Sequence, residues 1–198
     1  LFAQADKKTS RVVFAQALAY ASFLAMFLGD AASAMAYSQK AVALAEAAGD
    51  EGRGVLTIAL SSLSSGARAA GDYDIAFTLG ERVIQLLRES PEQPFFLGMA
   101  LLGHGSIAIE LGDYDTARAS LDESLTIARE AGDSFRIAHA LNSLGDLARC
   151  EQRYADAQTA YENSVLLLRE LDAQHDLASV LHNLGHTCLR LGNFERSY

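Results

Sequence analysis

The sequence predicts an all-α fold in which antiparallel helix hairpins stack one after another. The first indication is a recurrence: the segment ALNSLGD, which begins at Ala140, returns as VLHNLGH forty residues later at Val180. The second is composition, since half of the 198 residues are hydrophobic while proline occurs only twice, a balance that favours helices. The third is the spacing of Leu141, Leu144 and Ala148, which is typical of one helix face. A fixed period of this length indicates a repeat architecture.

One small residue marks the same place in every repeat. It recurs at intervals of 42, 41, 40 and 40 residues, at Ser22, Ser64, Gly105, Gly145 and Gly185. Twelve residues after each of the first four comes an alanine, at Ala34, Ala76, Ala117 and Ala157. We expect these small residues to let the two helices of a hairpin approach each other closely.

A turn lies between the small residue and the alanine of each repeat. The turns read LGDA at 28–31, AGDY at 70–73, LGDY at 111–114, EQRY at 151–154 and LGNF at 191–194. Glycine accepts the left-handed conformation that ends a helix, and an Asp or Asn after it can cap the next helix. The fourth turn has Gln152 in place of the glycine, so we expect its geometry to differ.

In chain order, these signals predict four helix pairs and a ninth helix. The expected spans are 11–28 with 31–48, 53–70 with 73–89, 95–111 with 114–131, 135–150 with 154–171, and 176–191. We expect residues 1–9 to be the tail of a preceding helix and residues 194–198 to open the partner of the ninth. The repeats (11–48, 53–89, 95–131, 135–171 and an incomplete 176–198) would form a single helical repeat domain over 1–198, which we interpret as a piece of a longer protein. Pro91 and Pro94 are expected to kink the stack.

Charge and cysteine content argue against several classes of function. The net charge is −9, with 8 basic and 10 acidic residues in 1–94 and 8 basic and 15 acidic residues in 95–198. An acidic surface disfavours direct nucleic-acid binding, which depends on Lys and Arg at phosphates. Cys150 and Cys188 are too few for a disulfide framework and fit a reduced, cytoplasmic protein. Since no uninterrupted apolar run reaches the ~18 residues that a membrane span needs, we expect no membrane partner either.

The repeat pattern resembles the tetratricopeptide repeat. The residues that carry the resemblance best are Leu141, Leu144, Gly145, Ala157, Tyr161, Leu181, Leu184 and Gly185. It covers the chain from about residue 12 and weakens toward the N-terminus, where Gly80 stands in the bulky place of Tyr161. The period of 40–42 residues exceeds the usual value of about 34. Such long repeats are similar to those of kinesin light chains and of the sensor domains of bacterial multidomain ATPase regulators of the LuxR type, such as the maltose regulator.

The resemblance implies a right-handed α-solenoid whose first helix in each pair lines a concave binding face. The polar residues that alignment places on this face are Ser61, Ser65, Arg68, Ser106, His139, Asn142, Asp146, Arg149, His182, Asn183, His186 and Arg190. Asn142, Asp146 and Arg149 lie on one helical stripe, where they can bind the backbone or a carboxylate of an extended peptide. The alternative is that these residues are solvated and pair locally, as Asp146 with Arg149.

Three other groups of residues admit a functional and a plain interpretation. Phe23, Met26, Phe27, Phe95, Phe96 and Met99 form either an apolar groove or, as we expect, ordinary interhelical core. His182 and His186 have a spacing that can hold a metal, but no further ligand is suitably placed, so we expect a polar pair in the groove and no metal. Cys150 and Cys188 are expected to be buried small residues.

The sequence therefore predicts a non-catalytic module without a cofactor that binds a protein or peptide, or a small effector. It contains neither a phosphate-binding GxxxxGK[ST] loop nor a GxSxG elbow. We expect the sensor or interaction part of a larger bacterial transcriptional or signalling regulator, in contact with neighbouring domains of the same polypeptide. The alternative is a scaffold that joins two proteins. Leaving Cys188, Leu189 and Leu191 uncovered would also permit a homodimer through the C-terminal edge.

Overall fold

The computed structural model describes residues 2–90 and 94–192, and these ranges are helical apart from short turns. The helices are α1 (Phe2–Phe27), α2 (Ala31–Ala48), the short 3-10 helix η1 (Gly49–Gly52), α3 (Arg53–Ala70), α4 (Tyr73–Arg88), α5 (Pro94–Leu111), α6 (Tyr114–Glu130), α7 (Ser134–Cys150), α8 (Tyr154–Glu170) and α9 (Gln174–Leu191). The described residues thus confirm the all-α fold. They divide into two compact units, residues 1–92 and residues 93–198, and each unit is described by itself.

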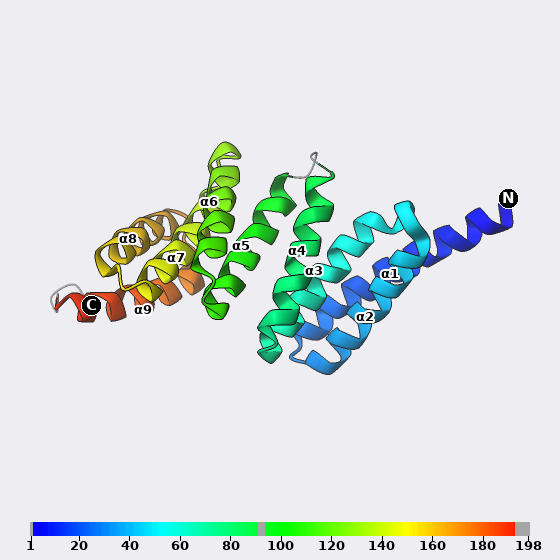
Figure 1. Ribbon diagram of the computed structural model, residues 1–198, viewed down its shortest axis with the longest axis horizontal. Helices are drawn as coiled ribbons and strands as arrows, with labels where there is room; N and C mark the ends of the chain where they lie inside the picture. Colours follow the sequence, from blue (N-terminus) through cyan, green and yellow to red (C-terminus); the bar gives the residue numbers. More distant parts are fainter. Residues whose placement is uncertain (1, 91–93, 193–198) are drawn as a thin grey trace. The chain divides into compact units, whose positions relative to one another are not determined.

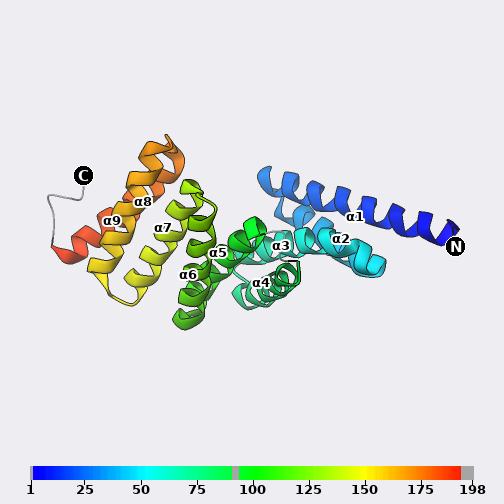
Figure 2. The same ribbon diagram turned by 90° about the horizontal axis from the view of Figure 1, so that it is seen from above.

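Within each unit, helices that follow one another in the chain pack as antiparallel neighbours (Figures 1 and 2). The first unit holds the hairpins α1–α2 and α3–α4, and α1 also contacts α3. The second unit holds the hairpins α5–α6 and α7–α8 followed by α9, and α7 contacts both α5 and α9. Within each unit, the first helices of successive hairpins therefore lie side by side, as the resemblance implies.

Most expected helix boundaries are confirmed to within one or two residues. The exception is the N-terminus, because α1 runs without a break from Phe2 to Phe27 and residues 2–9 are not the tail of a separate helix. The expected helix at 194–198 and Pro91 lie outside the described residues. Pro94 begins α5, a position where its missing N–H costs nothing.

In the third and fourth repeats the glycine faces a bulky residue sixteen positions later. A Cβ on Gly145 would lie 2.6 Å from Cε1 of Tyr161, and one on Gly105 would lie 2.7 Å from Cγ of Leu121. In the second repeat the sizes are exchanged: Gly80 replaces the bulky residue, and Ser64 fills the glycine place with its hydroxyl donating to the Ala76 carbonyl at 2.8 Å. Close helix contact is therefore kept in repeats whose sequences differ.

The turn at 151–154 adopts the same backbone as the glycine turns, contrary to our expectation. Gln152 has a φ of 61°, in the left-handed region that Gly29, Gly71, Gly112 and Gly192 occupy in the other turns. Its N–H donates to the Arg149 carbonyl at 3.0 Å, so the helix end is closed as in the other repeats. A non-glycine residue pays for this conformation with steric strain.

Several residues assigned to the core are exposed, and one assigned to an exposed edge is buried. Phe23, Phe27, Phe95, Phe96 and Met99 are exposed, Phe27 by 95%, so the plain interpretation of these aromatics as core is wrong. Among them, Phe95 is stacked under the Arg136 guanidinium, whose carbon lies 3.4 Å from the ring centre. Cys188, which was expected both as a buried small residue and at an uncovered C-terminal edge, is fully buried with Tyr161 and Leu184 in one core cluster. Cys150, also expected to be buried, is only half-buried.

In the part of the chain that the structure describes, two helical segments are long and apolar enough to cross a membrane. They are Ser10–Phe27 and Pro94–Leu111, each with a mean hydropathy of 1.4. The second segment, α5, contributes buried residues such as Leu101 and Ile107 to the core of its unit. Length and composition alone are weak grounds for a membrane span, because core helices of soluble proteins have the same properties.

Candidate functional site

A polar pocket in the second unit gathers side chains from three helices. It has a volume of about 360 Å³, and its lining residues are Arg149, Tyr154, His182, Asn183, His186 and Arg190. Arg149 lies in the last turn of α7 and Tyr154 is the first residue of α8. The remaining four belong to α9, where His182, His186 and Arg190 follow one another at four-residue steps and so share a face.

Asp146 lies at the base of this site and fixes two of its lining residues. Its Oδ1 accepts a hydrogen bond from the Tyr161 hydroxyl at 2.7 Å. The same oxygen lies 3.4 Å from Nη2 of Arg149 and 3.4 Å from Nδ2 of Asn183. Asn183 Nδ2 also lies 3.4 Å from Oδ1 of Asn142. Asp146 thereby links α7 to both α8 and α9 and holds Arg149 and Asn183 in place.

Burial and the neighbouring carboxylate shift the protonation of the groups under the pocket. Burial, followed by the negative charge of Asp146, raises the pKa of Tyr161 well above its ordinary value of 10. Interaction with the Tyr161 hydroxyl, and more weakly the charge of Asp146, raises the pKa of Arg149. Tyr161 therefore remains a neutral donor, and Arg149 remains a cation, at any physiological pH.

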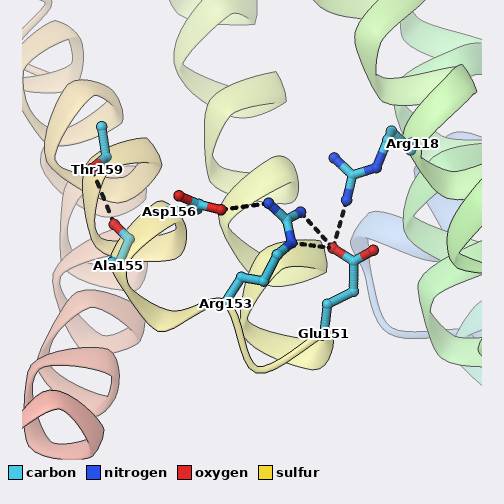
Figure 3. Close-up of polar contacts among 6 residues, drawn as sticks. All are labelled: Arg118, Glu151, Arg153, Ala155, Asp156 and Thr159. Carbon is cyan, nitrogen blue, oxygen red and sulfur yellow. Dashed lines mark hydrogen bonds and ion pairs between the residues drawn. The ribbon is translucent and has the colours of Figure 1, made fainter.

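The turn that joins α7 to α8 carries a separate ion-pair network (Figure 3). Oε2 of Glu151 lies 2.5 Å from Nη2 of Arg118 and 2.5 Å from Nη2 of Arg153. Arg153 also binds Asp156, with Nη1 and Oδ2 separated by 2.5 Å. Hydrogen bonds from Arg153 and then from Arg118 lower the pKa of Glu151. Glu151 follows closely on Arg149 in the chain, but its charge is matched by arginines that do not line the pocket.

Five of the twelve residues in our predicted groove line this pocket, two more lie next to it, and the other five, which include Ser61 and Ser65 of α3, do not line it. Arg149, His182, Asn183, His186 and Arg190 line the pocket, while Asn142 and Asp146 lie next to it through their contacts with Asn183. The local pairing of Asp146 with Arg149, our plain alternative, is thus present and coexists with the pocket.

The remaining predicted groove residues have other surroundings. His139 Nε2 lies 3.4 Å from Oδ1 of Asp176. Ser106 donates its hydroxyl to the Leu102 carbonyl at 3.0 Å, one turn earlier in its own helix. Arg68 is exposed in the last turn of α3, which belongs to the first unit. Whether these residues contact a ligand stays a prediction.

Sequence reasoning missed Tyr154 as a member of the site. Its aromatic ring was used only to mark the turn, since Tyr73 and Tyr114 stand at the same place in earlier repeats. The signal that could have found it is position: the first residue of α8 follows a short turn from the end of α7, so it must lie near Arg149. The prediction assumes that only the first helix of each pair forms the binding face, and Tyr154 belongs to a second helix.

The two histidines of the pocket lie against each other. Their rings lie 4.8 Å apart in an edge arrangement. Among the described residues, no group of three or more potential protein ligands is arranged to hold a metal ion. Because both rings line the pocket, a ligand bound there can contact them.

Comparison with known proteins identifies the fold of the chain. The tetratricopeptide repeat family matches residues 96–162 and 136–197, and anaphase-promoting complex subunit 5 matches residues 2–69. A search of curated proteins returns no match.

Solved structures with the same fold cover nearly the whole chain. BtubC (BKLC) from P. vanneervenii has a TM-score of 0.76 and 20% identity, over 97% of this chain and 84% of that one. A signal transduction ATPase with numerous domains and a tetratricopeptide repeat sensor, from Pyrococcus horikoshii, has a TM-score of 0.80 and 15% identity, over 94% of this chain and 29% of that one.

A Rap protein, solved in complex with competence and sporulation factor, also has a TM-score of 0.80, with 12% identity, over 94% of this chain and 51% of that one. This chain thus spans about half of the Rap protein and less than a third of the ATPase. At these identities the solved structures show the fold alone. The match to the repeat family, in contrast, extends over more than half of the sequence, and the chain therefore belongs to the tetratricopeptide repeat family.

Proposed function

We propose that this tetratricopeptide repeat chain is a non-catalytic interaction module that binds a protein or peptide partner at the pocket formed by α7, α8 and α9. The observation that carries the proposal is the convergence of Arg149, Arg190, His182, His186 and Asn183 around one pocket. Such groups donate hydrogen bonds to carboxylates and to backbone carbonyls, which an extended peptide offers at regular intervals.

The wider setting that we infer is the sensor or interaction part of a larger cytoplasmic bacterial regulator, with residues 1–198 acting as one repeat domain. The likeness to an ATPase that carries a tetratricopeptide repeat sensor supports this inference, as does the likeness to a Rap protein that was solved with a bound factor. In that setting, a ligand that binds one arrangement of the repeats more tightly shifts the population toward it and so regulates a neighbouring module.

A scaffold that joins two proteins is the second candidate, and the exposed aromatic residues favour it. Phe23, Phe27 and Leu28 are exposed on or next to the end of α1, and Leu189 is half exposed near the end of α9. Exposed apolar surfaces of this kind favour protein partners, including a second copy of the chain. Sedimentation of the purified chain tests whether this apolar surface binds a second copy: a dimer that forms through Leu189 gives a mass that falls when Leu189 is changed to Ser.

A peptide array tests the proposed function. The chain is screened against an array of unrelated short peptides, and the peptides retained are tested again with the R149A/R190A variant. The control is R129A/R169A, which removes the same charge from exposed arginines in the last turns of α6 and α8. We expect the first variant to lose the bound peptides and the control to keep them. Equal retention by both variants would refute a function of this pocket.

A further inference from the structure

The side chains that line the pocket are donors of hydrogen bonds or carriers of positive charge. Arg149 and Arg190 supply two guanidinium groups, His182 and His186 supply two imidazoles, and the lining includes no carboxylate. This composition is unusual on a chain whose net charge is −9. A set of cationic donors that converge from different helices is suited to an anion.

Two carboxylates that are close to Arg149 in the chain, Asp146 and Glu151, already have partners within the protein. Asp146 accepts its shortest hydrogen bond, of 2.7 Å, from Tyr161 beneath the pocket. Glu151 is held at 2.5 Å by both Arg118 and Arg153, as Figure 3 shows. Among the described residues Arg190 has no acidic partner, and Asp146 offsets only one of the two pocket arginines. The pocket therefore keeps a positive charge before either histidine is protonated.

The preference of arginine for the last turn of a helix does not by itself explain the positions of Arg149 and Arg190. Arginines are favourable in the last turn of a helix, and Arg129 and Arg169 occupy that position on α6 and α8. What distinguishes Arg149 and Arg190 is that they meet at one pocket together with two histidines. Arg129 and Arg169, on the second helices of their hairpins, provide a control that matches Arg149 and Arg190 in residue type, charge and position in the helix.

The beginning of α8 adds a weaker attraction for an anion. Tyr154, which lines the pocket, is the first residue of that helix. The preceding residue is Arg153, and its side chain makes no capping hydrogen bond, whereas Asp113 caps α6 and Asp133 caps α7. The first turn of α8 also contains Asp156, which Arg153 binds, so this helix start adds only a weak attraction for an anion.

The number of donors favours a phosphate ester over a carboxylate. A carboxylate has one negative charge and two oxygens, which a single guanidinium can satisfy. A phosphate monoester carries a charge of about −1.5 to −2 near pH 7 and three acceptor oxygens. It can therefore engage both guanidiniums and still accept from an imidazole or from the Asn183 amide.

We propose that this pocket binds a phosphate monoester group, carried either by a side chain of a partner peptide or by a small effector. The inference rests on the proposed function for its location and adds the chemical class of the ligand. No covalent step is involved, because the group is bound and released unchanged.

Titrations with matched peptides test the inference. The probes are short peptides of one sequence with phosphoserine, glutamate or serine at the centre, together with free O-phosphoserine, and binding is followed by calorimetry or NMR. We expect phosphoserine to bind about tenfold more tightly than glutamate, the effect of roughly one additional charge contact. R149A/R190A should remove this preference, R129A/R169A should keep it, and R149K/R190K should retain only part of it because lysine lacks the bidentate fork.

The same titrations identify the source of the phosphate. A phosphopeptide that binds more tightly than free O-phosphoserine indicates a protein partner, and equal affinities indicate a small effector. Equal binding of the phosphoserine and glutamate peptides, no binding of either, or a phosphate preference that survives in R149A/R190A would overturn the inference. If unphosphorylated array peptides still require Arg149 and Arg190, the proposed function stands and only the phosphate assignment fails. If no array peptide requires them, both fail.

Discussion

The contact between Gly145 and Tyr161 leads to a quantitative prediction about the repeat. A Cβ at residue 145 would lie 2.6, 2.7 and 2.9 Å from three atoms of the Tyr161 ring. The ring is fully buried, and its hydroxyl is tethered to Asp146 at 2.7 Å, so it cannot easily move aside. Overpacking of this kind costs about 3 kcal/mol at the upper end, while replacing a helical glycine by alanine recovers about 1 kcal/mol. We therefore expect G145A to lower the free energy of unfolding by about 2 kcal/mol.

Urea unfolding of G145A and of a matched control measures this effect. The control is G103A, in α5 of the same unit, where a Cβ has nothing within 4 Å; we expect it to be more stable than the wild type by about 0.5–1 kcal/mol. In a Y161A background the ring is absent, so G145A should also become favourable. If G145A and G103A have equal stability, the close contact between glycine and ring is not what shapes the hairpin.

Three further predictions concern the turn and the residues beneath the pocket. Q152G relieves the left-handed φ of 61° and should raise the free energy of unfolding by about 1 kcal/mol; a loss of stability would contradict the assigned backbone. Y161F should destabilise by about 2 kcal/mol near pH 7, since it removes a hydrogen bond to a charged carboxylate. Because the pKa of Tyr161 is raised in the folded state, the wild type loses stability as pH rises above about 10. The difference in free energy of unfolding between the wild type and Y161F, measured with urea, should therefore become smaller above that pH. The pKa of Glu151 is lowered in the folded state, so the stability that its carboxylate contributes is lost as pH falls below about 4.5. E151Q should lack this part of the acid dependence of unfolding.

Most of the fold could be predicted because the period of the sequence directly reflects the packing of the helices. Each repeat has a Ser or Gly at one position, and the first four have an Ala twelve positions later. These residues are small because the two helices of a hairpin pack closely at these points. The details that escaped prediction depend on tertiary context. Gln152 takes a glycine-like φ because the closing hydrogen bonds of the helix outweigh its strain. Phe27 is apolar yet 95% exposed, since a helix pattern shows which residues share a face but not what covers it.

The site was predicted in part for the same reason. Arg149, His182, Asn183 and His186 were placed on one face of the first helices by aligning the repeats, as the resemblance to the repeat family implies. The alignment could not show that Asp146 is engaged by Tyr161, fifteen residues later in the chain. Nor could it show that Tyr154 completes the pocket from a second helix. Both facts depend on how α8 packs against α7, which no spacing in the sequence encodes.

The central claim is that the pocket between α7, α8 and α9 is where this chain recognises its ligand. NMR chemical-shift mapping of the isotope-labelled chain, titrated with the phosphoserine peptide, tests it most directly. We predict that the largest saturable shifts occur at Arg149, Tyr154 and the 182–190 segment, and that they vanish in R149A/R190A. Shifts centred on other helices, or shifts of equal size in that variant, would contradict the claim.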